Sequence, residues 1–239
     1  MKKSLNSKTE PIINAQQTTT SGEQSSLDWA VWGFPVALML VIALIALGGQ
    51  SWIDALCYDR VALQQGQWWR LVTGSLVHAP GNTVEWLGLH FLGPWHLFLN
   101  ELGLVVLVLL CPEPLSSAVW LRRLLLLSLG MSAGLYFFTP QLRWYVGLSG
   151  VIHGMFVLGL VPQVLKKDIV ALGCLLYLLG KLGYELYAGA PVSDEHAIGM
   201  PVALASHLWG SVAAVIYGLV FGVFWKPEVW NFRRKKKAA

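Results

Sequence analysis

A serine stands between two glycines in an apolar stretch that reads Gly-Leu-Ser-Gly-Val-Ile-His-Gly over residues 147–154. A hydroxyl group in such surroundings needs a hydrogen-bond partner. Gly150 and Gly154 are four residues apart, so on a helix they share one face that a neighbouring helix can approach closely. If that neighbour carries a base, Ser149 is a candidate nucleophile. The same pattern is also typical of a packing seam in which the serine bonds to its own helix.

His207 is the candidate base. It lies in an apolar segment where Ala203, Gly210, Ala214 and Gly218 recur at spacings of three and four, so small residues flank it on one helix face. A serine and a histidine on facing helices are the parts of a nucleophile and general-base pair. A packed histidine with purely structural hydrogen bonds also fits this pattern.

His96 and Asn100 share one face of another apolar segment, where they could donate hydrogen bonds to an oxyanion together with the Ser149 N–H. Ser149, His207 and His96 each follow the start of an apolar stretch by four or five residues. If these stretches are helices that cross a membrane, we therefore expect the three residues at a common depth, roughly 6 to 8 Å below the outer end of each helix. His153 is a rival base, but it lies one helical turn deeper, and we favour a packing or hydrogen-bonding role for it.

Three more ionisable residues lie in apolar segments. Lys181 and Glu185 have i, i+4 spacing, which predicts a structural ion pair. Glu101 follows Asn100 directly and therefore points to another helix face, so we assign it no catalytic role.

The composition is that of a membrane protein. The 239 residues are 55% apolar and only 13% charged, and the mean hydropathy is +0.56. The net charge of +4 comes from basic residues near segment ends and not from a stripe on a soluble face, so no nucleic-acid partner is expected. Cys57, Cys111 and Cys174 are too dispersed to predict a disulfide framework or a metal site.

Six apolar stretches predict an all-α membrane domain over residues 29–225, because each is about long enough to cross roughly 30 Å of hydrocarbon. The stretches are residues 29–47, 92–110, 119–138, 144–161, 169–187 and 202–225. Tryptophans in residues 48–91 predict an outer loop in the headgroup layer. Polar residues 1–28 predict a disordered tail, and residues 226–239 form a basic tail.

The distribution of Lys and Arg predicts that both termini are cytoplasmic. In this orientation all but four of the 17 basic residues lie on the inner side, and the exceptions are Arg60, Arg70, Arg143 and Lys181. The basic C-terminal run would then bind anionic lipid. We expect a multi-pass integral membrane protein, in the inner (cell) membrane of a bacterium.

Residues 69–218 resemble the rhomboid intramembrane serine proteases, whose fold is a bundle of six transmembrane helices. The shared motifs are Trp69-Arg70 with Thr73 and His78, His96-x-x-x-Asn100, Gly147-Leu148-Ser149-Gly150 and Ser206-His207-x-x-Gly210. The Val-Ile-His-Gly that follows the serine motif is most similar to the rhombosortase branch. That similarity implies substrates with a C-terminal tail in which a Gly-Gly motif precedes a membrane helix and a basic end.

The resemblance implies a catalytic dyad of Ser149 as nucleophile and His207 as general base. The residues that would stabilise the oxyanion or the substrate are His96, Asn100, Gly147 and Leu148. The family dyad lacks an aspartate, and no carboxylate is close to His207 in the sequence. The expected partners are membrane-anchored proteins with a transmembrane helix and the lipid bilayer itself, and no metal or organic cofactor is expected.

Two departures from the family pattern concern the site. Residues 79–95 separate His78 from His96, a longer gap than in rhomboids. Either this loop carries an insertion or His90 takes the place of the loop histidine, so His78 is left out of the predicted site. Ser206 and Trp209 replace small residues beside His207, and Trp209 either narrows the site or faces lipid.

Two other functions compete with proteolysis. An inactive rhomboid-like protein would bind or escort transmembrane helices, but it would usually have lost Ser149 or His207. A transporter would be expected to show an internal repeat, and we see none. We therefore predict cleavage near the outer face of the membrane, in a polar cavity capped by residues 188–200.

Overall fold

The computed structural model describes residues 28–80, 83–86, 89–92, 94–192, 195–199 and 201–226. The two predicted tails, apart from Asp28 and Lys226, lie outside these residues. The side chains of residues 83–92, including His90, also lie outside the description.

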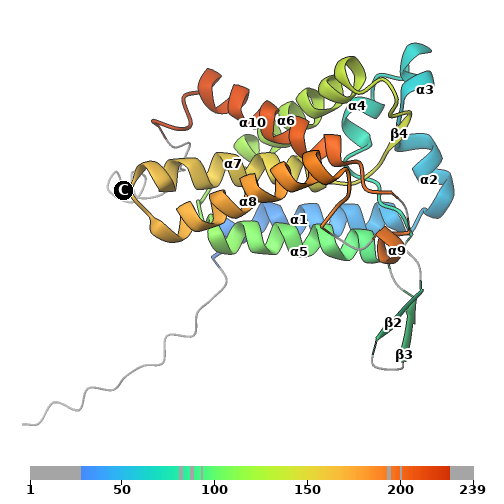
Figure 1. Ribbon diagram of the computed structural model, residues 1–239, viewed down its shortest axis with the longest axis horizontal. Coiled ribbons are helices and arrows are strands. Elements are labelled where there is room, and N and C mark those ends of the chain that lie inside the picture. Colours follow the sequence, from blue (N-terminus) through green and yellow to red (C-terminus); the bar gives the residue numbers. More distant parts are fainter. Residues whose placement is uncertain are drawn as a thin grey trace, which may run out of the picture.

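Six long apolar helices form the bundle seen in Figure 1. They are α1 (Trp29–Ala46), α5 (Trp95–Leu110), α6 (Ser117–Phe138), α7 (Ser149–Leu165), α8 (Ile169–Ala188) and α10 (Leu204–Val220). Helices α1, α6 and α8 have 18 to 22 residues and are apolar enough to cross a membrane. The other three have 16 or 17 residues. Each predicted stretch thus overlaps one apolar helix, and the six-span topology itself stays a prediction.

Short polar residues set the ends of several of these helices. The Asp28 side chain accepts a hydrogen bond from the Ala30 N–H at the start of α1, and Ser116 does the same at α6. Asp168 accepts from two N–H groups at the start of α8. Such caps satisfy backbone donors that have no partner within the helix. Helix α8 ends at Ala188, and Gly189 follows it in the left-handed conformation with φ of 62°.

Three helices begin later than the predicted stretches. Residues 144–148 are not helical, because Trp144–Tyr145 (β4) pairs with Tyr58–Asp59 (β1) from the first loop. Ser149 is therefore the first residue of α7, His96 the second of α5 and His207 the fourth of α10. The three residues lie at helix N-termini, and not a full turn inside their helices as predicted.

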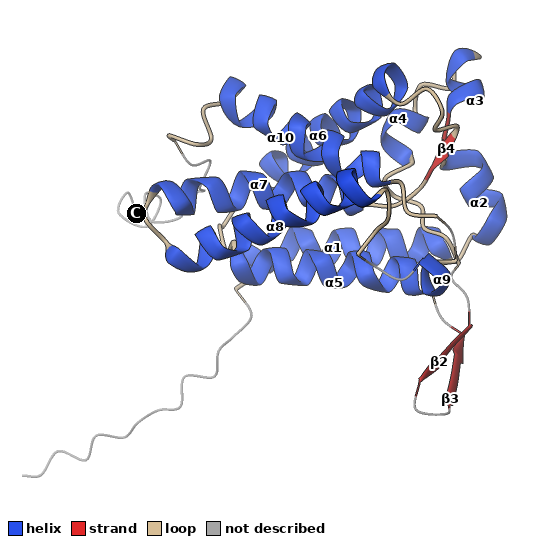
Figure 2. Cartoon of the chain, in the orientation of Figure 1, coloured by secondary structure: helices blue, strands red, loops and turns tan. Residues whose placement is uncertain are grey.

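The described part of the first loop contains three short helices, α2 (Gly49–Leu56), α3 (Arg60–Gln64) and α4 (Arg70–Thr73) (Figure 2). Side chains of the Trp69-Arg70-x-x-Thr73 motif donate hydrogen bonds to backbone oxygens at the end of α2. The bonds run from Trp69 to Ala55 (3.3 Å), from Arg70 to Asp54 and Cys57 (2.9 Å each) and from Thr73 to Leu56 (2.6 Å). This motif therefore serves as a C-terminal cap that fixes the loop.

Helices α7 and α10 pack through their small residues, as predicted. A Cβ atom added to Gly154 would lie only 2.6 Å from the Gly210 carbonyl oxygen, and one on Gly210 would collide with the Gly150 carbonyl. Ala214 lies against the same face of α7. The predicted glycine groove is confirmed, and it lets the two backbones come into direct contact.

Candidate active site

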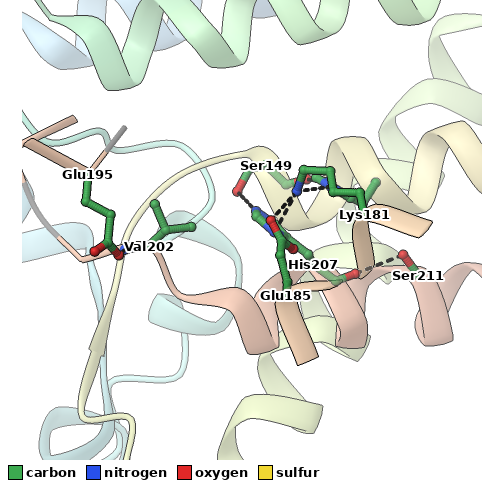
Figure 3. A network of polar contacts seen from close by, with 8 residues as sticks. Ser149, Lys181, Glu185, Glu195, Val202, His207 and Ser211 are labelled. Carbon is green, nitrogen blue, oxygen red and sulfur yellow. Dashed lines mark hydrogen bonds and ion pairs between the residues drawn. The ribbon is translucent and has the colours of Figure 1, made fainter. Parts of the chain in front are cut away.

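Ser149 and His207 meet at the N-terminal ends of α7 and α10 (Figure 3). The Ser149 Oγ lies 3.1 Å from the His207 Nε2, and the histidine is only 4% exposed. Their neighbours explain the approach, because a Cβ on Gly150 would be 2.6 Å from the Ser206 carbonyl oxygen. The structure therefore brings together two residues that are 58 positions apart in the chain.

A carboxylate lies behind the histidine. The Oε2 atom of Glu185 is 2.8 Å from the His207 Nδ1, and the side chain of Glu185 is only 2% exposed. Its other oxygen is 2.5 Å from the Lys181 Nζ. The sequence predicts this ion pair but not its contact with His207, because Glu185 and His207 are 22 residues apart in the chain. The available signal was a charged pair in an apolar helix, where the burial of charge is costly.

His153 lies beside the pair and is not positioned as its base. Its ring stacks on His207 with the centroids 4.1 Å apart and the planes 12° apart. Its Nδ1 is 2.7 Å from the Ser149 carbonyl oxygen, and its Nε2 is 3.1 Å from the Lys181 Nζ. These contacts agree with the predicted packing and hydrogen-bonding role.

His96 presents an N–H donor next to Gly147. The Ala79 N–H donates to the His96 Nδ1 at 3.2 Å, so the ring proton of the neutral imidazole is on Nε2. That atom would be 2.6 Å from a Cβ at Gly147, whose φ of 115° also requires glycine. Leu148 is buried and precedes α7. Because the first N–H groups of α7 have no intrahelical partners, they add donors for a developing negative charge.

Asn100 lies one turn below His96. Its Nδ2 donates to the His96 carbonyl oxygen at 2.8 Å, which leaves its second N–H free for a ligand. Its buried Oδ1 has no hydrogen-bond partner among the described residues. The sequence predicts Asn100 near the site, and in the structure its side chain lines the same cavity as Ser149 and His207.

His78, which is not among the predicted site residues, lies directly behind His96. The two rings meet edge to face with centroids 5.1 Å apart, and burial lowers the pKa of His78 to about 3. The gap between the two histidines contains a β-hairpin of Thr83–Trp86 (β2) and Leu89–Leu92 (β3), which extends away from the bundle in Figure 1. The His90 side chain lies outside the described residues, so both explanations for the long gap stay predictions.

A cavity of about 550 Å³ opens from the serine and histidine between α5, α7 and α8. Its polar end is lined by Ser149, His207, His96, Asn100, His153 and Lys181. Apolar side chains such as Val106 and Leu160 line the remainder. Ile198 in α9 (Glu195–Ile198) closes one side, and Glu195 accepts a hydrogen bond from the Val202 N–H at 2.7 Å (Figure 3). Among the described residues of the predicted cap, Ile198 therefore lies against the cavity.

Comparison with protein families identifies the fold. A family model described as the Rhomboid domain matches residues 65–224. The chain belongs to the rhomboid family. Rhomboid proteins are typically intramembrane serine proteases that act on membrane proteins within the bilayer, so this rhomboid is an integral membrane protein. No curated protein matches the chain.

The matched region of this rhomboid includes all the site residues described in this subsection. Trp209 does not line the cavity, so it does not narrow the site. Its Nε1 donates to the Thr139 Oγ1 at 3.1 Å, and its ring packs on Gly134 and stacks on Phe138. It therefore fastens α10 to α6. Within the described part of the rhomboid, no cluster of three or more His, Cys, Asp or Glu residues could hold a metal ion.

Proposed function

We propose that this rhomboid is an intramembrane serine endopeptidase that cleaves membrane-anchored proteins with a Ser149–His207 dyad. The observation that carries the proposal is the 3.1 Å contact between the serine hydroxyl and the imidazole, at the polar end of an apolar cavity. In such a site a base that is already hydrogen-bonded to the hydroxyl can remove its proton during attack.

The reaction would proceed in two steps. The His207 Nε2 takes the Ser149 proton as Oγ bonds to the carbonyl carbon, and the imidazolium then protonates the leaving amine. The oxyanion would be stabilised by the His96 Nε2–H, the N–H groups that begin α7 and the free amide N–H of Asn100. A water molecule, deprotonated by the same histidine, would hydrolyse the acyl enzyme.

The cavity suggests the kind of substrate. Its apolar walls along α5 and α8 suit an apolar segment, while the reacting groups lie at helix N-termini beside the first loop. A helical amide is already hydrogen-bonded within its helix, so the substrate must unwind before attack. Glycine near the cleaved bond would favour unwinding, because it lowers helix stability by about 1 kcal/mol relative to alanine.

We further propose six membrane spans with cytoplasmic termini, cleavage near the outer face and a location in a bacterial inner membrane. The Val-Ile-His-Gly sequence that follows the serine motif supports membership of the rhombosortase branch. Substrates would then carry a Gly-Gly motif before a C-terminal membrane helix. An escort role without catalysis is less well supported, because it gives no reason for a buried histidine that contacts a serine hydroxyl on one side and a buried carboxylate on the other.

The test is cleavage of a transmembrane substrate by the full chain in liposomes. We compare the wild type with Ser149→Ala, His207→Ala and Ser128→Ala, the last a buried serine on α6 outside the cavity. Cleavage should be lost in the first two variants and preserved in the third. Cleavage that survives in Ser149→Ala would refute the proposal. A panel with and without a Gly-Gly motif tests the branch, since indifference to the motif would argue against a rhombosortase.

A further inference from the structure

The ion pair of α8 joins a buried carboxylate, Glu185, to a partly exposed lysine, Lys181. Glu185 contacts His207 on α10, as the dashed lines in Figure 3 show, and Lys181 contacts His153 on α7. We infer that Glu185 and Lys181 are positioning residues that fix the tautomer of His207, and this inference rests on the proposed function.

The hydrogen-bond donors and acceptors around His207 permit one assignment. An ionised carboxylate can only accept, so the 2.8 Å contact with Glu185 requires the proton of His207 to be on Nδ1. The Nε2 atom then has a lone pair toward the Ser149 hydroxyl at 3.1 Å, as a general base needs. With the opposite tautomer, two lone pairs would face each other at Nδ1 and an N–H would point at the serine.

Lys181 holds the carboxylate oxygen of Glu185 that does not face His207. Its Nζ donates to Oε1 of the carboxylate and also to the Nε2 of His153, at 2.5 and 3.1 Å. The His153 Nδ1–H can then donate to the Ser149 carbonyl oxygen at 2.7 Å. Lys181 also lies 3.3 Å from the His207 Nδ1, but a protonated nitrogen cannot accept from it. Every polar atom in this network therefore has a compatible partner.

The Glu185→Gln variant tests the tautomer directly, because it replaces one acceptor oxygen with a donor NH₂ and preserves the size of the side chain. Lys181 would hold the amide oxygen, so the amide NH₂ would face the His207 Nδ1. The histidine would then accept at Nδ1 and carry its proton on Nε2, where it cannot deprotonate Ser149. We expect kcat to fall by roughly 10³- to 10⁴-fold, the scale of a histidine base in the wrong tautomer. KM should change little, because Glu185 does not line the cavity.

The double variant Lys181→Met/Glu185→Gln distinguishes positioning from simple structural support. Without the lysine the amide can turn its oxygen toward the His207 Nδ1, so kcat should recover by at least roughly tenfold over Glu185→Gln alone. If the pair were purely structural, the double variant would have a kcat no higher than that of Glu185→Gln, because the second substitution would remove a further stabilising contact. Glu101→Gln on α5 and Lys166→Met at the end of α7 are matched controls outside the cavity, and both should retain wild-type kcat.

The ¹⁵N chemical shifts of histidine-labelled protein report the tautomer directly, with His207→Ala used to assign the signals. We expect Nδ1 to be protonated in the wild type and Nε2 in Glu185→Gln. A proton on Nε2 in the wild type, a Glu185→Gln variant with wild-type kcat, or a double variant no faster than Glu185→Gln would each overturn the inference. Ser149→Ala is assayed alongside: its continued cleavage refutes the proposed function, whereas its inactivity beside a fully active Glu185→Gln refutes only this inference.

Discussion

Replacing Gly154 with alanine should separate the serine from its base without touching either residue. The added Cβ would lie 2.6 Å from the Gly210 carbonyl oxygen, whereas Cβ atoms in proteins keep at least 3.0 Å. Both atoms involved belong to backbones or are fixed to them, so α7 and α10 must move apart by about 0.4 Å or more, since close-packed interiors cannot absorb the overlap elsewhere. A shift of this size lengthens the 3.1 Å contact between Ser149 and His207 beyond a good hydrogen bond.

The expected consequence is a loss of kcat of roughly tenfold, because a misplacement of 1 Å costs on the order of 100-fold. Overpacking should also lower the free energy of unfolding by about 1 to 3 kcal/mol. Gly154→Val should be worse than Gly154→Ala. The assays are cleavage of a transmembrane substrate in liposomes and thermal unfolding in detergent micelles.

The control is Gly183→Ala on α8, where an added Cβ meets no atom within 4 Å. That variant should retain wild-type kcat and be equally stable or slightly more stable, because alanine favours a helix by up to about 1 kcal/mol. If Gly154→Ala had the kcat and stability of the wild type, the close contact between α7 and α10 would not be what positions the dyad.

Three further outcomes follow from contacts in and around the site. His96→Phe should lower kcat by roughly 10²- to 10³-fold with little change in KM, because it removes a donor to the oxyanion; a variant with normal kcat would exclude that role. Arg70→Met should lower the free energy of unfolding by about 2 to 4 kcal/mol, since the buried arginine caps α2 through two backbone oxygens, and an unchanged thermal midpoint would contradict this cap. Burial lowers the pKa of His78 from 6.5 to about 3, so between these values the unfolded chain binds a proton that the folded chain does not. Stability should therefore fall as the pH drops below 6.5, by up to about 1.4 kcal/mol per pH unit. In urea titrations at pH 7, 6 and 5 this slope should be smaller in His78→Phe than in the wild type or the exposed control His196→Phe.

The sequence predicts the parts of this fold that depend on local pattern. Hydropathy locates six apolar helices, since each crosses the bundle as one continuous apolar segment. Small residues at spacings of three and four predict that α7 and α10 touch, because only glycine and alanine permit such an approach. The mutual placement of Ser149 and His207 follows from this one contact.

Features that depend on distant pairing could not be predicted. Helix α7 starts at Ser149 because residues 144–145 pair with a strand that lies in the first loop, and nothing local in residues 144–148 indicates this. The rotation of α8 about its own axis could not be predicted either. Its surface is apolar on several sides, so hydropathy does not reveal which side faces α10. The contact of Glu185 with His207 was missed for that reason. The contact between His78 and His96 could not be predicted either, because the hairpin of β2 and β3 separates the two histidines in the sequence.

The reactivity of Ser149 toward a fluorophosphonate is the most direct test of the central claim. The full chain in membranes is treated with the probe, and the modified peptide is located by mass spectrometry. We expect one adduct on Ser149, none in Ser149→Ala and a labelling rate that falls sharply in His207→Ala, because the probe requires a deprotonated hydroxyl. Labelling at the same rate in all three proteins would contradict the claim that this serine and histidine act together.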